Sequence, residues 1–356
     1  MRLTPPLFAL ATLAPAAAIG LAILIGGVWS VVALLSMTLL TGLLDHFIRW
    51  AETPREVPPG AEFPAGDRLC VTLGAVQIVL IPLTVLALSS QGDVHPAEKV
   101  AIFLAAGLWL GQVGNANAHE LIHRGDRRLF RLGRALFITL LFGHHTSAHR
   151  QVHHPWVATP RDPSSARLGE GYYRFLLRSW RGNLRAGFHA ERALLERRHG
   201  DRWWRYHPYT LYALGAVLCL AAGALLGGVA GVLWYLALAG YAQSQILLSD
   251  YVQHYGLRRA EIAPGKYAPV GPQHSWNAGH GATSALMLNA PRHSDHHARP
   301  TRPWTALELP DEEDAPRLPY SLPAMATIAL VPPIWRRMMD PRARAWAAQD
   351  RRADAA

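Results

Sequence analysis

Histidines are concentrated in four short stretches of the sequence, and their spacing is typical of metal ligands. Three of the stretches, HELIH, HRQVHH and HSDHH, contain histidines four residues apart. On a helix, residues four apart share a face, so each such pair can point its imidazoles at one spot. Three or four imidazoles usually complete a site for one ion, so nine indicate two ions. The nine candidate ligands are His119, His123, His149, His153, His154, His254, His293, His296 and His297.

The residues alone leave the identity of the metal open, because imidazoles suit iron, zinc and copper. The stretch from His119 to His123, with Glu120 as a base, is by itself the pattern of a zinc protease. Such a protease needs only one further ligand, whereas this chain offers seven. The surplus favours two redox-active irons over one hydrolytic zinc. Isolated histidines elsewhere are expected to have structural roles: His46, His95, His189, His199 and His207.

The composition predicts a membrane protein with a large polar part. Of 356 residues, 50% are apolar and 17% are charged, and the mean hydropathy is +0.07. The net charge of +10 comes mostly from arginines beside apolar segments; it indicates membrane topology rather than binding to nucleic acid. The two cysteines, Cys70 and Cys219, exclude a disulfide framework and a built-in iron–sulfur or rubredoxin module.

Six apolar runs approach the length of about 20 residues that a membrane span needs. Ala16-Ala17-Ala18 would suit signal-peptide cleavage, but the apolar run continues to Gly27, which favours a retained span. We therefore predict an all-α integral membrane protein with six transmembrane helices and a cytoplasmic helical and loop cap that carries the histidines. The predicted spans are 5–27, 28–47, 69–89, 98–118, 208–228 and 229–249.

These spans divide the chain into four parts and give it a direction in the membrane. Residues 1–118 hold helices one to four, 119–207 the first histidine segment, 208–250 helices five and six, and 251–356 the second histidine segment and tail. Arginine-rich loops stay on the cytoplasmic side. This rule places both termini, loop 50–68 and all nine histidines there, and the Gly227-Gly228 turn outside.

Three shorter features complete the predicted organisation. Residues 129–143 are apolar but too short to span, so we expect a helix packed under the bundle. Residues 172–199 mix aromatic residues and leucines with arginines and predict an amphipathic surface helix. Residues 321–335 are apolar but interrupted by prolines, which predicts a buried or interfacial piece rather than a seventh span.

Taken together, the motifs resemble those of the integral-membrane di-iron alkane 1-monooxygenases, within the wider membrane desaturase and hydroxylase superfamily. The resemblance rests on HELIHR at 119–124, HRQVHH followed by VATPRDPSSARLG at 149–169, DYVQHYGL at 250–257, RHSDHHA at 292–298 and PPIWRRMMDP at 332–341. Three details depart from the family pattern. Asp250 replaces a common Asn, Ala148 replaces an acidic residue, and His144-His145 is an extra pair.

The resemblance implies a di-iron enzyme that uses O2 to hydroxylate the terminal methyl group of medium- and long-chain alkanes to 1-alkanols. It implies electrons from rubredoxin or a similar protein with its reductase, an apolar substrate from the bilayer, lipid contacts, and a bacterial-type inner membrane. No catalytic residue is expected beyond the metal ligands. Carboxylates should orient the imidazoles; the candidates are Glu120, Asp162, Asp250 and Asp295.

Four alternatives remain at this stage. A xylene-type hydroxylase of aromatic methyl groups and a fatty-acyl or lipid desaturase would use the same histidine motifs. An intramembrane zinc protease would contain zinc and consume no O2. A metal carrier would release its metal readily and need no reductant.

Overall fold

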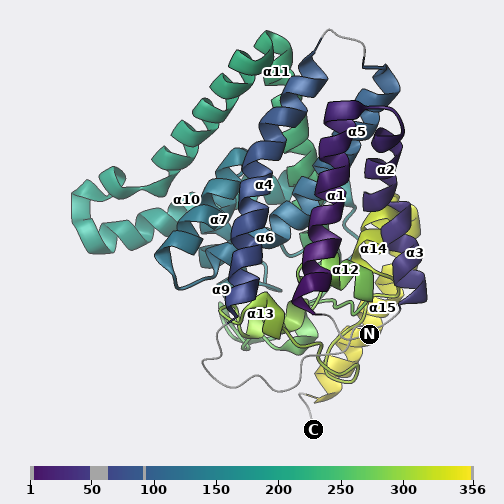
Figure 1. Ribbon diagram of the computed structural model, residues 1–356. Coiled ribbons are helices and arrows are strands. Elements are labelled where there is room, and N and C mark those ends of the chain that lie inside the picture. Colours follow the sequence, from purple (N-terminus) through teal and green to yellow (C-terminus); the bar gives the residue numbers. More distant parts are fainter. Residues whose placement is uncertain (1–3, 49–62, 91–93, 354–356) are drawn as a thin grey trace.

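A computed structural model describes residues 4–48, 63–90 and 94–353. The chain is mostly helical. Long helices stand side by side in one half of the molecule, and shorter helices and loops form a second layer at one end of them (Figure 1). Four helices in the described part are long and apolar enough to cross a membrane, or five if one bent pair counts as a single span.

The first two apolar runs form a helical hairpin. Helix α1 (Pro5–Ile25) ends at Gly26 and Gly27, whose φ angles of 71° and 58° suit glycine. Glu98 accepts a hydrogen bond from the Gly27 N–H at 3.0 Å, which ties the turn to the next pair of helices. The predicted tight turn at Gly26-Gly27 is therefore confirmed.

A single span was predicted for the second run, 28–47, but the run does not form one straight helix. It divides into α2 (Val28–Met37) and α3 (Leu39–Phe47), which are bent by 44°. The Thr38 hydroxyl bonds the Leu34 carbonyl at 2.7 Å, and the Thr41 hydroxyl bonds the Ser36 carbonyl at 3.0 Å. Hydroxyls that bond carbonyls of the preceding turn compete with the helix and bend it.

The third and fourth runs form the rods nearest the histidines. Helix α4 (Pro64–Ser89) begins before the predicted residue 69, because Pro64 occupies its first turn. The rest of the predicted 50–68 loop falls largely outside the described residues. Helix α5 (Pro96–Trp109), the π-helical turn η1 (Leu110–Gly114) and α6 (Asn115–Ile122) follow one another without a gap. The helical rod therefore continues to Ile122, beyond the end of the span predicted at residue 118, and His119 lies on it.

Helix α11 (Pro208–His254) contains the predicted turn at Gly227-Gly228. The backbone leaves helical geometry there, with φ/ψ of −151°/22° and 59°/−141°. Figure 1 shows α11 rising to the top of the molecule and returning. The count of spans above takes Tyr172–His254 as a single helix, so the six-span arrangement stays a prediction.

The predicted helices 129–143 and 172–199 are both present. They correspond to α7 (Arg127–Thr139) and α10 (Tyr172–His199). Helix α10 buries one face, formed by residues four apart: Phe175, Ser179, Asn183 and Gly187. Between α7 and α10 lie α8 (His144–Ala148), the π-helical turn η2 (His149–His153) and α9 (His154–Trp156), and η3 (Gly200–Tyr206) leads into α11.

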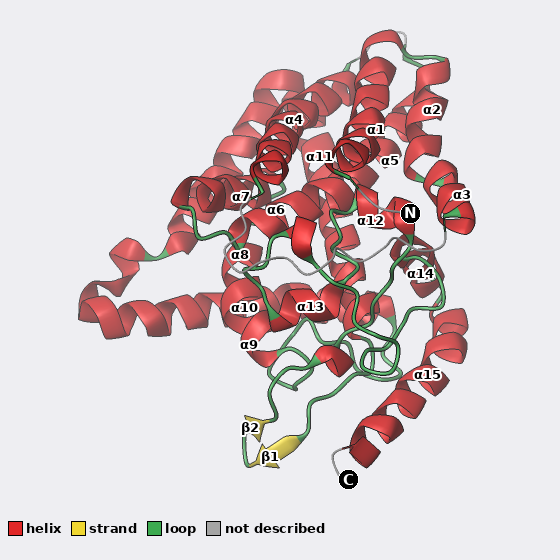
Figure 2. Cartoon of the chain, turned by 60° about the horizontal axis from the view of Figure 1, so that its bottom comes forward, coloured by secondary structure: helices red, strands yellow, loops and turns green. Residues whose placement is uncertain are grey.

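The C-terminal part holds the other short elements. The predicted piece at 321–335 is partly buried. Helix α14 (Leu322–Ala329) buries Leu322, Met325 and Ala329, and the apolar side chains that follow it, Leu330, Val331 and Ile334, are exposed. Helix α15 (Pro332–Ala353) was not predicted, and neither was the hairpin of β1 (Glu261–Ala263) and β2 (Lys266–Tyr267), which Figure 2 shows near the C-terminal end. The remaining elements are η4 (Pro272–His274), α12 (Gly281–Leu286), α13 (His293–Ala298) and η5 (Trp304–Ala306).

Close packing within the α11 hairpin generates the first testable prediction. A methyl group at Gly231 would overlap the backbone carbonyl of Gly223 in the opposing half, whereas one at Gly240 would meet nothing within 4 Å. We expect Gly231→Ala to destabilise the protein by about 1–3 kcal/mol, the usual cost of overpacking. Gly240→Ala is the matched control on the same helix. Thermal unfolding in detergent should separate the two, and equal midpoints would contradict this packing.

Candidate metal centre

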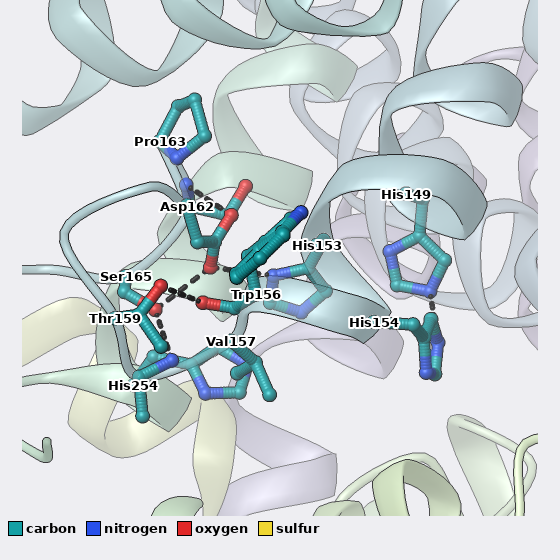
Figure 3. Close-up of polar contacts among 12 residues, drawn as sticks. His149, His153, His154, Trp156, Val157, Thr159, Asp162, Pro163, Ser165 and His254 are labelled. Atoms are coloured by element: carbon teal, nitrogen blue, oxygen red, sulfur yellow. Dashed lines mark hydrogen bonds and ion pairs between the residues drawn. The ribbon is translucent and has the colours of Figure 1, made fainter. Parts of the chain in front are cut away.

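Four separate segments bring the nine predicted histidines to the junction of the two layers. His119 lies on α6 and His123 caps its end. The HRQVHH stretch occupies η2 and the start of α9, and His254 is the last residue of α11. The final three histidines lie on the short helix α13. Figure 3 shows the His149 ring beside that of His154, and the His153 ring near that of His254.

The imidazoles form two groups, each with candidate ligand atoms within 4.8 Å of one another. We name them site A and site B. Site A comprises His119, His123, His149, His154 and His296, and site B comprises His153, His254, His293 and His297. All nine predicted residues are thus brought together, and the described part of the chain adds no cysteine or carboxylate to either group.

The spacing of the ring nitrogens fits metal coordination. In site A the Nε2 atom of His149 lies 2.7 Å from that of His119 and 2.9 Å from that of His154. In site B the Nε2 atom of His293 lies 3.0 Å from that of His254 and 3.1 Å from that of His297. Nitrogens about 2.1 Å from one ion and at right angles would be about 3 Å apart. Both groups therefore have the donor set and spacing to hold an ion.

One expectation from the spacing is wrong. His149 and His153 were predicted to share one spot, but His149 belongs to site A and His153 to site B. The reason is that η2 is a π-helical turn. In such a turn hydrogen bonds join residues five apart rather than four. His149 consequently pairs with His154, and His153 turns to the other group.

For most of these imidazoles the surroundings favour the neutral form, which is the form that binds a metal. Burial, together with repulsion from neighbouring imidazoles, holds the pKa values of His149, His154 and His296 well below the usual range. Several ring nitrogens also have no hydrogen-bond partner among the described residues, including His123 Nε2 and His153 Nε2. Unprotonated and unpaired nitrogens provide the lone pairs that an ion needs.

One of the four predicted carboxylates orients a ring of site B. Asp162 Oδ2 lies 2.9 Å from His153 Nδ1 and accepts a hydrogen bond from the Ser165 hydroxyl at 2.7 Å (Figure 3). Burial lowers the pKa of His153, but the Asp162 carboxylate outweighs burial and raises it overall. The bond to Nδ1 leaves His153 Nε2 free to face its group, as in carboxylate–histidine–metal arrangements.

The other three carboxylates have different surroundings. Glu120 pairs with Arg124 at 3.3 Å. Asp295 accepts bonds from Arg302 at 3.0 Å and from the Glu308 N–H at 2.9 Å. Asp250 is buried, and its Oδ2 has no hydrogen-bond partner in the described part of the chain.

Residues outside the predicted set also lie beside the groups. His145 stacks on His149 with ring centroids 5.2 Å apart, and it lines a cavity of about 30 Å³ with Asn115, His119, Asp250 and His293. That volume holds about one water molecule. His145 belongs to the extra pair His144-His145 noted in the sequence, whereas Asn115 carried no sequence signal beyond its position one helical turn before His119.

The isolated histidines lie outside both groups. His95 and His207 cap the N-termini of α5 and α11 by accepting hydrogen bonds from Ala97 N and Tyr209 N. His199 stacks on Tyr206 at 4.0 Å between ring centroids. The structural roles predicted for these residues are therefore confirmed.

Comparison with known proteins agrees with this arrangement. The fatty acid desaturase family model matches residues 99–329, which include all nine histidines. The chain belongs to the fatty acid desaturase family.

Several relatives of this desaturase-family chain are named oxygenases. It is 35% identical to the alkane 1-monooxygenase of Acinetobacter baylyi over 69% of this chain and 59% of the relative. It is 33% identical to alkane 1-monooxygenase 1 of Pseudomonas aeruginosa, over 70% of this chain and 64% of the relative. The xylene/toluene monooxygenase hydroxylase component of Pseudomonas putida is 29% identical over 70% of this chain and 66% of the relative. The chain therefore matches less than two thirds of the length of these relatives.

The Asp162–His153 contact generates a second prediction. Asp162→Asn keeps the shape of the side chain but removes the charge that fixes the imidazole. We expect metal affinity to fall about 10- to 100-fold, the usual effect of losing such a partner. Asp201→Asn, on η3 and exposed, is the control and should retain full metal content. Elemental analysis after dialysis against a graded chelator series measures both, and equal retention would contradict the orienting role.

Proposed function

We propose that this protein is a di-iron monooxygenase that hydroxylates the terminal methyl group of alkanes, with site A and site B each holding one iron. The observation that carries the proposal is the division of nine imidazoles, each buried or half-buried, into two adjoining groups. One hydrolytic zinc would leave one group without an ion. Membership of the desaturase family and the alkane 1-monooxygenase relatives support redox iron over zinc.

The reaction converts an alkane, O2, two electrons and two protons into a 1-alkanol and water. Two bound ferrous ions would supply the O2 activation that cleavage of a methyl C–H bond requires. The nine imidazoles would hold the two ions, and Asp162 fixes the His153 ring through Nδ1. Apolar side chains beside the small cavity, including Ile246, Met287 and Leu322, exclude bulk water and direct a methyl group towards His119 and His293.

A larger cavity of about 380 Å³ provides a route for an alkane. It lies among α2, α3, α5, η1, α11 and α14, and most of its lining is apolar. Consecutive residues in two segments line the two cavities, which are therefore adjacent. Leu248 and Ser321 line the larger cavity, and their neighbours Ser249 and Leu322 line the smaller one. An alkane dissolved in the bilayer would enter here with its methyl end towards the histidines.

We further propose six spans, with both termini and the histidine layer in the cytoplasm of a bacterial-type inner membrane. Separate counting of the two halves of α11 supports the six spans, and the arginine bias of the loops supports the orientation. Arg134 and Arg150 lie over the Phe130 ring, at 5.8 and 4.8 Å from its centroid. Arg150 follows the candidate ligand His149 directly, so these two arginines form a basic patch close to the metal centre. Such a patch would suit the docking of an acidic electron donor such as rubredoxin.

A second candidate is hydroxylation of aromatic methyl groups. The xylene/toluene monooxygenase relative favours it, at lower identity than the alkane 1-monooxygenases. Both reactions would use the same metal centre, so they differ in what the larger cavity admits.

Metal and product analysis tests the proposed function. The purified protein should contain about two irons per chain, and with rubredoxin and its reductase it should convert octane, dodecane or hexadecane into 1-alkanols. His119→Ala in site A and His254→Ala in site B should each lower the iron content and abolish turnover, whereas His189→Ala should not. A single zinc would overturn the di-iron assignment. A benzyl-type alcohol from xylene with no alcohol from any alkane would favour the second candidate.

Labelling of single cysteines tests the six-span topology. Cys70 and Cys219 are first replaced by alanine, and cysteine is then introduced for Val94, Arg205 or Val229. In intact spheroplasts a membrane-impermeant maleimide should label the Val94→Cys and Val229→Cys variants, because the proposed topology places both cysteines on the outer side of the membrane. The Arg205→Cys variant should react only after permeabilisation. Labelling of that variant in intact spheroplasts would refute the orientation.

A further inference from the structure

His145 belongs to the extra histidine pair of the sequence, and the proposed metal centre assigns it no role. It precedes His149 by four residues, which is the spacing of the metal-binding pairs on a helix. The structure nevertheless leaves it out of both groups of candidate ligands, although its side chain is buried. A buried imidazole outside both groups acts through the side chains that it packs against.

The His145 ring belongs to a cluster of flat rings that reaches site A. It stacks on Phe142, with ring centroids 4.9 Å apart and 16° between the planes. It also stacks on His149, with centroids 5.2 Å apart and 30° between the planes. Phe137 packs against the same ring at 4.8 Å and 58°. Offset-stacked and tilted contacts at such distances are the favourable arrangements of ring pairs.

The turn before α8 fixes the base of this cluster. Leu141 has a φ of 54°, a left-handed conformation of the kind that ends helices, and it follows the last residues of α7. The Phe142 N–H then donates to the Phe137 carbonyl at 2.8 Å, and both of these rings are fully buried. From α11, the Gln243 amide donates to the Leu140 carbonyl at 2.8 Å. The core therefore holds the rings on which His145 rests.

Within site A, His149 lacks the hydrogen bond that usually orients a metal ligand. Its Nε2 atom lies 2.7 Å from that of His119 and 2.9 Å from that of His154. Its Nδ1 atom has no hydrogen-bond partner in the described part of the chain, whereas His153 Nδ1 in site B is bonded to Asp162. A metal-binding imidazole is normally oriented by a hydrogen bond at its other nitrogen. For His149, ring stacking takes the place of that bond.

We propose that His145 is a positioning residue for site A. Its ring fixes the plane of the His149 imidazole and so the direction in which His149 Nε2 meets an ion. This inference rests on the proposed occupation of site A by a metal ion and adds a supporting residue to that site. The support comes from the face of the ring, so a phenyl ring can replace the imidazole and an aliphatic side chain cannot.

Titration of the metal-free, full-length protein with Co²⁺ in nanodiscs tests this role without turnover, because Co²⁺ bound by imidazoles has a visible spectrum. The wild type should bind an ion at each site. His145→Leu should weaken Co²⁺ binding at site A roughly two- to tenfold, the range for a lost ring pair, and leave site B unchanged. A general loss of packing would weaken both sites. Titration in the His254→Ala background, which disables site B, identifies the weakened step.

Two further variants separate stacking from other roles of the residue. His145→Phe keeps a flat ring without the nitrogens and should bind Co²⁺ at site A as tightly as the wild type. It decides the question even where His145→Leu does not fold. His144→Leu is the matched control, because it makes the same change at the adjacent buried histidine, which packs on Trp180 at 5.4 Å between ring centroids and belongs to neither group. It should leave both affinities unchanged.

The inference is overturned by wild-type affinity in His145→Leu, or by an equal loss of affinity in His144→Leu. It is also overturned if His145→Phe loses as much affinity as His145→Leu, because the ring nitrogens would then be what site A requires. Failure of the proposed function is distinct. In that case the wild type itself would leave one or both sites without an ion, or would form no alcohol when loaded with iron.

Discussion

The crowding of nine imidazoles into one small volume is the constraint on which the rest of the structure depends. Nε2 atoms from different segments lie 2.7–3.1 Å apart, a separation at which two charged rings would repel strongly. Burial and the neighbouring rings keep these groups unprotonated, and Asp162 holds the one ring whose charge it favours. Because no segment supplies a whole group, the four segments must be fixed relative to one another by the surrounding helices.

The helices meet this requirement through local departures from regular geometry. The turn η2 separates His149 from His153 and so divides one motif between the two groups. The turn η1 occurs in the rod that carries His119 and His123. Close approach of η1 to α11 depends on Gly107 and Gly111, whose missing side chains leave room for Tyr241 and Gln245. The metal centre and the neighbouring cavity are thus products of the same packing.

Much of this arrangement could be predicted from the sequence, because its signals are local. Paired glycines marked the turns at 26–27 and 227–228, apolar length marked the spans, and histidine density marked all nine residues of the two groups. The division between the groups could not be predicted, because His149 and His153 have helical spacing and only the backbone reveals the π-turn. The bend at Thr38 was missed because hydroxyl-to-carbonyl bonds leave no hydropathy signal. Helix α15 was missed because its prolines suggested a loop, although the first two occupy its first turn, where the missing N–H costs nothing.

The distribution of the ligands along the chain fixes the order in which the centre can be assembled. Site A lacks one member, and site B lacks two, until α13 has been synthesised. By then every apolar helix that precedes α13 has already left the ribosome. Both groups can accordingly be complete only late in synthesis, and the last-made third of the polypeptide supplies the ligands that complete them.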